Sequence, residues 1–125
     1  MRAILVLVPL ILVGAALAHS AAEPVRDDKK PAPVDYKNDV APMLDAKCVR
    51  CHKPQKADGK LDMTTRAAML KGGISGPAIA PGSPDKSLIV ELIHFNEMPP
   101  KNVKIRVTKD ELKLLKAWIE AGAPE

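Results

Sequence analysis

The chain has 125 residues, which predicts a single domain. Its 19 Lys and Arg against 15 Asp and Glu give a net charge of +4, and this mildly basic balance with only one Trp, one Tyr and one Phe argues against a nucleic-acid-binding protein. So few large core residues in so small a domain favour a covalent staple or a buried ligand that supplies apolar bulk.

Residues 1–18 have the pattern of a secretory signal peptide. Arg2 precedes an apolar run, and Ala16-Leu17-Ala18 provides the small residues after which a signal peptidase cleaves. Ser20-Ala21-Ala22 is a second candidate cleavage site, which would extend the peptide to residue 22. The alternative is an uncleaved membrane anchor, although the run is shorter than the roughly 20 apolar residues of a membrane span. Membrane attachment is expected only in that case.

Residues 19–34 are rich in proline and charge, with Pro24, Pro31 and Pro33 among them. This composition predicts a flexible linker. The folded domain is therefore expected over residues 35–124.

The first helix of that domain is predicted from Asp35, its N-cap, to about Lys47, with Pro42 disturbing its middle. Its apolar face would consist mainly of Tyr36, Val40, Met43 and Leu44. A short second helix is expected from Thr64 or Thr65 to Lys71, where Gly72-Gly73 ends it.

A third helix is predicted to open at Ser83-Pro84, with serine as N-cap and proline at the first position. Leu88, Leu92 and Phe95 recur along it at near-helical spacing.

The last helix carries the clearest signals. Thr108 and Glu111 form a capping box, and Gly122 ends the helix. Its apolar face is expected to be Leu112, Leu115 and Ile119, flanked by Leu114 and Trp118. No alternating run predicts a strand, so an all-α fold of about four helices is expected.

Cys48-Val49-Arg50-Cys51-His52 is a C-x-x-C-H sequence, the attachment signal for c-type haem. Two cysteines three positions apart on a helical turn point the same way, so their thiols can add to the two vinyl groups at one porphyrin edge. The adjacent His52 then lies under the ring, where a neutral imidazole nitrogen can ligate iron. The motif predicts one haem c, held covalently through two thioethers.

Other chemistries stay open for the two cysteines. They could form a disulfide or a thioredoxin-like redox pair, although the chain lacks the βαβ context of a thioredoxin motif. They could also hold zinc, but the sequence has no second Cys pair, so the site would need His52 and the distant His94.

The second iron ligand decides what a haem site does, because a Met thioether raises the reduction potential and fills the coordination position. Met98 follows a predicted helix, and the Pro99-Pro100 pair stiffens the loop that would present its sulfur. Met63 lies close to the motif and is a candidate for the wall of the cleft, while His94 is a rival ligand. Met43 and Met69 lie in apolar helical faces and are expected in the core.

Further short pieces follow a fixed order around these motifs. They are Val40-Ala41-Pro42-Met43-Leu44, Gly59-Lys60-Leu61-Asp62, Leu70-Lys71-Gly72-Gly73, Gly76-Pro77-Ala78-Ile79, Pro81-Gly82-Ser83-Pro84, Met98-Pro99-Pro100 and Trp118-Ile119-Glu120-Ala121-Gly122-Ala123. Together with the C-x-x-C-H sequence they resemble the planctomycete-type cytochrome c domain, a branch of the class I cytochrome c fold, over roughly residues 36–123. Lys60 departs from the family pattern, which often has a second glycine after Gly59.

The resemblance implies a small, loop-rich class I cytochrome c-like fold around one covalently bound haem. It implies that Cys48 and Cys51 bind the haem vinyls, that His52 is the proximal ligand and that Met98 is the distal one. It also implies that the first helix packs against the last.

We therefore expect a mono-haem c-type cytochrome that acts in electron transfer outside the cytoplasm, and not an enzyme, because His–Met ligation leaves no open iron position. C-type haem is installed after export, which agrees with a signal peptide and a periplasmic or secreted location. The alternatives are a haem enzyme or gas sensor with a labile Met98, and a non-haem binding module of the cell envelope.

Redox partner proteins are the expected partners. Basic residues surround the motif and Met98 in the sequence and could steer an acidic partner, or form an ordinary solvated surface. They are Lys47, Arg50, Lys53, Lys56, Lys60, Lys101 and Lys104.

Overall fold

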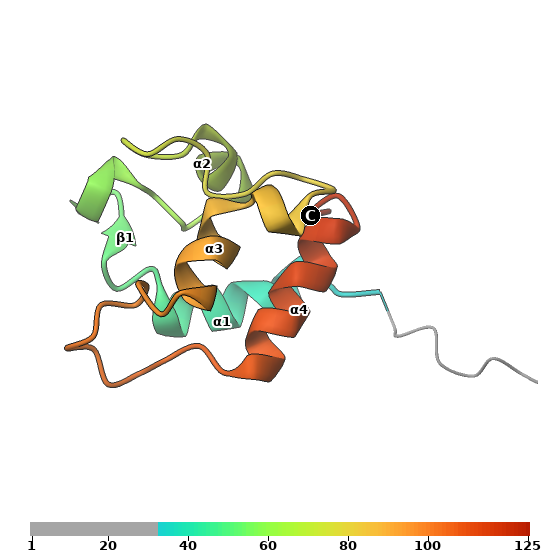
Figure 1. The fold of residues 1–125 in the computed structure, drawn as a ribbon. Coiled ribbons are helices and arrows are strands. Elements are labelled where there is room, and N and C mark those ends of the chain that lie inside the picture. Colours follow the sequence, from blue (N-terminus) through green and yellow to red (C-terminus); the bar gives the residue numbers. More distant parts are fainter. Residues whose placement is uncertain (1–32) are drawn as a thin grey trace, which may run out of the picture. The chain divides into compact units, whose positions relative to one another are not determined.

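The computed structural model describes residues 33–125, which form short helices joined by long loops (Figure 1). The predicted signal peptide and nearly all of the predicted linker lie outside the described residues. Within the described range, no helix combines the length and apolarity needed to span a membrane. The elements in chain order are η1 (Tyr36–Val40), α1 (Ala41–Lys47), β1 (His52–Lys53), β2 (Lys56–Ala57), η2 (Asp58–Lys60), α2 (Arg66–Lys71), η3 (Pro84–Lys86), α3 (Leu88–His94) and α4 (Lys109–Glu120).

The first predicted helix forms over the expected range but in two parts. Asp35 caps it as predicted, because its side chain accepts a hydrogen bond from the backbone N–H of Asn38 at 2.7 Å. The turn η1 has π-helical hydrogen bonds, and α1 then begins beside Pro42. Proline has no N–H to donate to the preceding turn, so the helix changes its hydrogen-bonding pattern there.

A two-stranded antiparallel sheet corrects the expectation of a purely helical fold. Strands β1 and β2 pair His52 with Ala57 and Lys53 with Lys56. Each strand has only two residues, so no alternation of apolar and polar residues marks them in the sequence. The hairpin directly follows the second cysteine of the motif.

Helix α2 matches its prediction closely. Thr65 is the N-cap and accepts a hydrogen bond from the backbone N–H of Ala68, and Gly72 ends the helix with φ of +74°. Such a left-handed end favours glycine, which has no Cβ to clash.

The third predicted helix is interrupted. Ser83-Pro84 opens only the short turn η3, and α3 starts again after Ser87. The Ser87 side chain is buried, donates to the carbonyl oxygen of Ser83 at 3.0 Å and accepts from the backbone N–H of Ala80 at 2.9 Å. A serine that bonds to the backbone in this way competes with helix continuation. Phe95, which the spacing placed on the apolar face, lies just beyond α3 and is exposed.

Helix α4 carries the predicted capping box. Thr108 accepts a hydrogen bond from the N–H of Glu111, and the Glu111 carboxylate accepts one from the N–H of Thr108. The helix ends at Glu120, and Gly122 follows with φ of +94°.

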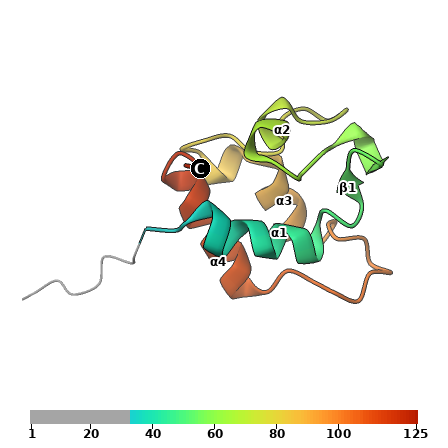
Figure 2. The ribbon, with the colours of Figure 1, turned by 180° about the vertical axis from the view of Figure 1, so that it is seen from behind.

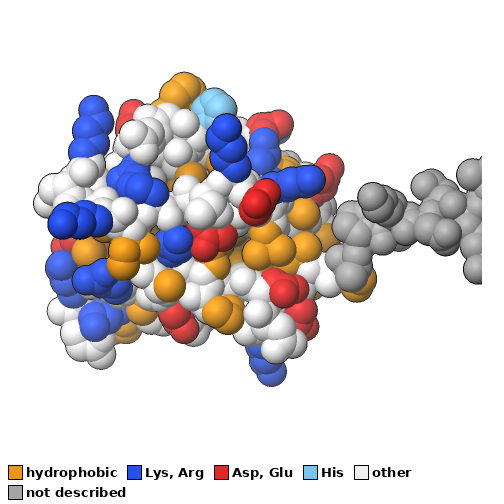
Figure 3. Space-filling view, turned by 90° about the horizontal axis from the view of Figure 1, so that it is seen from below, with side chains coloured by type: hydrophobic (Ala, Val, Ile, Leu, Met, Phe, Trp, Pro, Cys, Tyr) orange, Lys and Arg blue, Asp and Glu red, His pale blue; other side chains and the backbone are white. Residues whose placement is uncertain are grey.

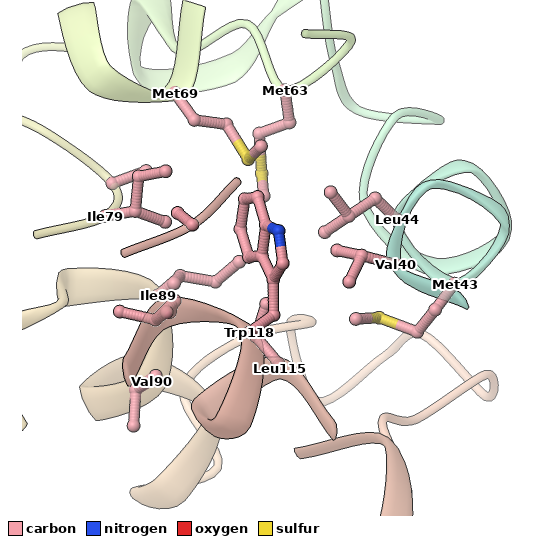
Figure 4. Packing of buried hydrophobic residues seen from close by; sticks show 13 residues of the cluster. Val40, Met43, Leu44, Met63, Met69, Ile79, Ile89, Val90, Leu115 and Trp118 are labelled. Carbon is pink, nitrogen blue, oxygen red and sulfur yellow. The ribbon is translucent and has the colours of Figure 1, made fainter. Parts of the chain in front are cut away.

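Trp118 is fully buried at the centre of the core. The sequence had placed it only at the flank of the apolar face of the last helix. Its ring stacks on Tyr36 with centroids 5.4 Å apart, and its N–H donates to the carbonyl oxygen of Pro124. In Figure 4, Met69 from α2 and Leu44 from α1 point toward the indole. The first helix thus packs against the last, as the resemblance implied, and Figure 2 shows the two side by side.

Candidate functional site

A cavity of about 770 Å³ lies beside this core. Its size is in the range of roughly 300–1,000 Å³ that is usual for cofactor and small-molecule sites. Its walls come from the end of α1, the β1–β2 hairpin, α3 and the segment between α3 and α4. The cavity wall includes Cys48, Cys51, His52, Met63, Met98 and Ile105. The fold thus brings all four predicted site residues to one cavity.

The two cysteines lie on the turn that continues α1. Cys48 donates its N–H to the carbonyl oxygen of Leu44 at 2.7 Å, and the N–H groups of Cys51 and His52 both donate to the carbonyl oxygen of Cys48 at 3.0 Å. This helical turn places residues three apart on one side, so both cysteines line the cavity. Neither is in a disulfide.

The two thiols have different surroundings. Burial raises the pKa of the Cys48 thiol to about 11, against the lowering effect of the Lys47 ammonium, so Cys48 is neutral at pH 7. The Cys51 sulfur instead accepts a hydrogen bond from the Lys56 ammonium at 3.5 Å.

The imidazole of His52 is oriented by the main chain. Its Nδ1 lies 2.9 Å from the carbonyl oxygen of Asp58, which can only accept a hydrogen bond. Nδ1 therefore carries the proton, and Nε2 keeps a free lone pair that can ligate a metal ion. The hairpin makes this contact, since it returns the chain to His52 and the N–H of Asp58 donates to the carbonyl oxygen of Cys51.

The candidates for a second ligand occupy different places. Met98 lines the cavity with 37 % of its surface exposed, whereas Met63 also lines it but is buried in the core. His94 is exposed and stacks edge-on against Phe95, and it does not contribute to the described cavity wall. Met43 and Met69 are buried in the core as predicted.

The backbone fixes the start of the Met98 loop, residues 96–103. The N–H groups of Glu97 and Met98 both donate to the carbonyl oxygen of Leu92, at 2.8 and 3.0 Å, which closes the end of α3. Beyond it, the N–H of Val103 donates to the carbonyl oxygen of Pro100 at 2.9 Å. Two hydrogen-bonded turns therefore hold the loop on both sides of the proline pair.

Sequence reasoning missed two contributors to the site. The carbonyl of Asp58 is a main-chain group, which no side-chain pattern can reveal. Arg106, whose guanidinium binds the Met98 loop, follows no motif in the sequence. Among residues 33–125, no group of three or more His, Cys, Asp or Glu side chains is placed to hold a metal ion, as a structural zinc site would need.

Residues 48–102 match the family model described as Planctomycete cytochrome C. The match contains both cysteines, His52 and Met98, and is narrower than the span of about 36–123 over which the sequence resembles the family. No curated protein and no solved structure matches this chain. A cytochrome c domain suggests a haem-binding role in electron transfer. The family model thus confirms, over residues 48–102, the resemblance to the planctomycete cytochrome c domain that the motifs of the sequence predicted.

Proposed function

We propose that this protein is a mono-haem c-type cytochrome that carries electrons outside the cytoplasm. One observation carries the proposal: Cys48, Cys51, His52 and Met98 all line a single cavity of cofactor size. The family match over the same residues supports the identity of the cofactor.

The side chains fit the roles that a haem requires. Each cysteine would add its S–H across one vinyl double bond, with sulfur bonding to one carbon and hydrogen to the other, so no oxidant is needed. His52 would ligate the iron through Nε2, because the Asp58 carbonyl holds the proton on Nδ1. Met98 would supply the thioether on the other side. Bound haem supplies a one-electron couple.

An electron carrier fits this ligand set better than an enzyme. With His52 and Met98 both bound to the iron, a substrate or diatomic gas would have to displace one of them. The apolar side chains of Met63, Ile89 and Ile105 in the cavity wall would keep water away and favour the reduced, less charged iron.

The location outside the cytoplasm follows from the same cofactor. C-type haem is attached after export, and cytochrome c domains are usually exported. The predicted signal peptide over residues 1–18 supplies the means, although it lies outside the described residues. Mass spectrometry of the mature protein would locate the cleavage site after Ala18 or Ala22.

The decisive experiment is expression with a cytochrome c maturation system. We expect the purified, denatured protein to keep a redox-difference spectrum and to weigh one haem more than its residues. The Cys48→Ala, Cys51→Ala double variant should lose both signals. A colourless wild-type protein of unmodified mass would favour the non-haem binding module, and rapid carbon monoxide binding by the reduced native protein would favour a sensor or enzyme.

The basic surface near the cavity is the proposed docking site for an acidic redox partner. Lys and Arg side chains gather at the left of Figure 3, the side on which β1 and the segment before α4 lie in Figure 1. Four cationic side chains line the cavity: Lys47, Arg50, Lys56 and Lys104. Lys47 already forms an ion pair with Glu111 at 3.1 Å, so the other three residues are the candidates for steering a partner toward the cavity.

A further inference from the structure

Arg106 makes more side-chain hydrogen bonds to the Met98 loop than any other described residue. Its guanidinium donates to the carbonyl oxygens of Pro99, Pro100 and Asn96, and to the side-chain oxygen of Asn96. The distances to the Pro100 and Asn96 carbonyls are 3.0 and 3.3 Å. A guanidinium has five N–H donors in a rigid fork, so one side chain can satisfy several carbonyls at once.

These acceptors lie on both sides of Met98. Asn96 precedes it by two residues, and Pro99 follows it directly. The prolines have no N–H groups, so the loop cannot stabilise itself with hydrogen bonds donated at those positions. The charged hydrogen bonds from Arg106 replace them and span the backbone from which the Met98 side chain projects.

Arg106 is itself anchored to the cysteine-bearing turn. The Lys47 ammonium donates to the Arg106 carbonyl oxygen at 2.7 Å and also pairs with Glu111 at the start of α4. Lys47 directly precedes Cys48. Its side chain is only 13 % exposed, so solvent screens these contacts less than it would on an open surface.

The arrangement connects the two sides of the cavity through one residue. Ile105 and Val107 line the cavity, while Arg106 between them is absent from its described wall and holds the loop instead. The backbone of Arg106 is held from α1, and its side chain holds the segment with Met98.

We propose that Arg106 is a positioning residue that holds the Met98 sulfur where it can ligate the haem iron, a role that rests on the proposed function. A loop held by several charged hydrogen bonds loses little entropy when the thioether binds iron. Without the guanidinium, the loop samples more conformations, and the fraction of molecules with Met98 dissociated rises.

The test compares Arg106→Gln with Arg106→Lys in the haem-loaded protein. In the glutamine variant we expect a lower reduction potential, a weaker iron–thioether charge-transfer band and carbon monoxide binding roughly tenfold faster, on the scale of one or two lost charged hydrogen bonds. The lysine variant keeps the charge but has fewer donors in a different geometry, so it should be intermediate. Met98→Ala defines the fully dissociated limit.

A matched control separates positioning from general stability. The Arg66 side chain also donates a hydrogen bond to a backbone carbonyl, that of Ala123 near the C-terminus. Arg66 does not belong to the described cavity wall. Arg66→Gln should lower the free energy of unfolding but leave the potential and the charge-transfer band unchanged. If it matches Arg106→Gln in ligation, the proposal is wrong.

Amide hydrogen exchange measures how often the Met98 loop opens, independently of the iron. Exchange at Glu97, Met98 and Val103 should be faster in Arg106→Gln than in wild type and near wild type in Arg66→Gln. If Arg106→Gln does not fold, Asn96→Gly removes one acceptor while suiting the positive φ of that position, and it should shift exchange and ligation in the same direction by less.

Three further results would overturn the proposal. They are unchanged ligation and exchange in Arg106→Gln, full rescue of the potential by lysine while exchange stays fast, and unchanged ligation in a loosened loop. The proposed function fails separately. A wild-type protein without covalent haem refutes the cytochrome, and unchanged exchange in Arg106→Gln still refutes the clamp on the loop.

Discussion

The imidazole of His52 depends on a main-chain oxygen for its orientation, which makes it insensitive to the side chain at position 58. The 2.9 Å contact with the Asp58 carbonyl sets the tautomer of the neutral imidazole, and the β1–β2 hairpin returns the chain so that Asp58 reaches His52. A main-chain carbonyl does not titrate, so the acceptor of this hydrogen bond stays in place when carboxylates change charge.

The choice of second ligand is testable by single substitutions. We expect Met98→Ala to lower the reduction potential and to open the iron to carbon monoxide, because a soft thioether stabilises the reduced iron. His94→Ala should change neither quantity, since His94 is exposed and outside the described cavity wall. Potentiometric titration of both variants checks this, and a lowered potential in His94→Ala alone would reverse the assignment.

Gly72 is required by both its backbone angles and its surroundings. Its φ is +74°, and a Cβ there would come within 2.0 Å of the Gly76 carbonyl oxygen. Gly82 has a similar φ of +76°, but nothing lies within 4 Å of an added Cβ. Gly82→Ala should therefore destabilise the protein by about 1–2 kcal/mol from backbone strain alone, and Gly72→Ala by clearly more.

Chemical denaturation of the two alanine variants measures this difference. Equal losses in unfolding free energy would mean that the loop from Gly72 to Gly76 relaxes to admit the methyl group.

At the scale of elements, the capping box of α4 combines helix initiation with contact to α1. Thr108→Ala removes the side-chain oxygen that accepts from the N–H of Glu111, and we expect a loss of about 1 kcal/mol in unfolding free energy. Ser87→Ala is a useful comparison, because it would instead leave the backbone N–H of Ala80 without its buried acceptor. Thermal or denaturant unfolding checks both losses, and an unchanged stability in Thr108→Ala would show that the cap is dispensable.

Glu111 makes this element sensitive to acid. Burial raises the pKa of its carboxyl, but hydrogen bonds from the Thr108 backbone and from Lys47 outweigh it, so the net pKa is lowered. A carboxyl with a lowered folded-state pKa contributes stability above its unfolded pKa and loses it as the pH falls through the folded value. The contribution is small, because the carboxylate is partly exposed.

Glu111→Gln should therefore be less stable than wild type at neutral pH, and the two should converge as the pH falls below the ordinary glutamate pKa. Unfolding free energies measured from neutral to acidic pH check this convergence. A constant difference at all pH values would assign the effect to lost packing and not to charge.

At the scale of the whole molecule, the basic side of the cavity predicts a dependence on ionic strength. Arg50 and Lys104 line the cavity and are exposed, so Arg50→Glu, Lys104→Glu should slow oxidation of the reduced protein by an anionic oxidant such as ferricyanide, by about tenfold at low salt. Lys71→Glu, Lys113→Glu is the matched control, since these exposed lysines are outside the described cavity wall.

Stopped-flow rates at increasing salt measure the effect. The wild-type rate should fall with ionic strength, because mobile ions screen exposed charges. A rate independent of salt in the wild type, or equal slowing in both double variants, would leave these charges as an ordinary solvated surface.

Local sequence signals were sufficient for much of the fold. Asp35, Thr65 and the Thr108–Glu111 pair cap their helices as predicted, because a cap depends on residues within one turn. The strands were missed and the third helix was interrupted, because two-residue strands carry no periodicity and the bonds of Ser87 depend on how the chain returns to Ala80. The central place of Trp118 likewise depended on which helices meet.

The sequence by itself determined the chemistry that the chain offers: two cysteines and a histidine in the spacing of a haem-attachment motif, and a methionine before two prolines. Each of these two features is a short continuous stretch of the chain, so local geometry defines it. Only the tertiary structure decided that the four residues share one cavity, that the Asp58 carbonyl sets the His52 tautomer and that Arg106 holds the Met98 loop. Those contacts are made between segments that folding brings together. Their energies depend on burial and distance, which only the folded chain defines.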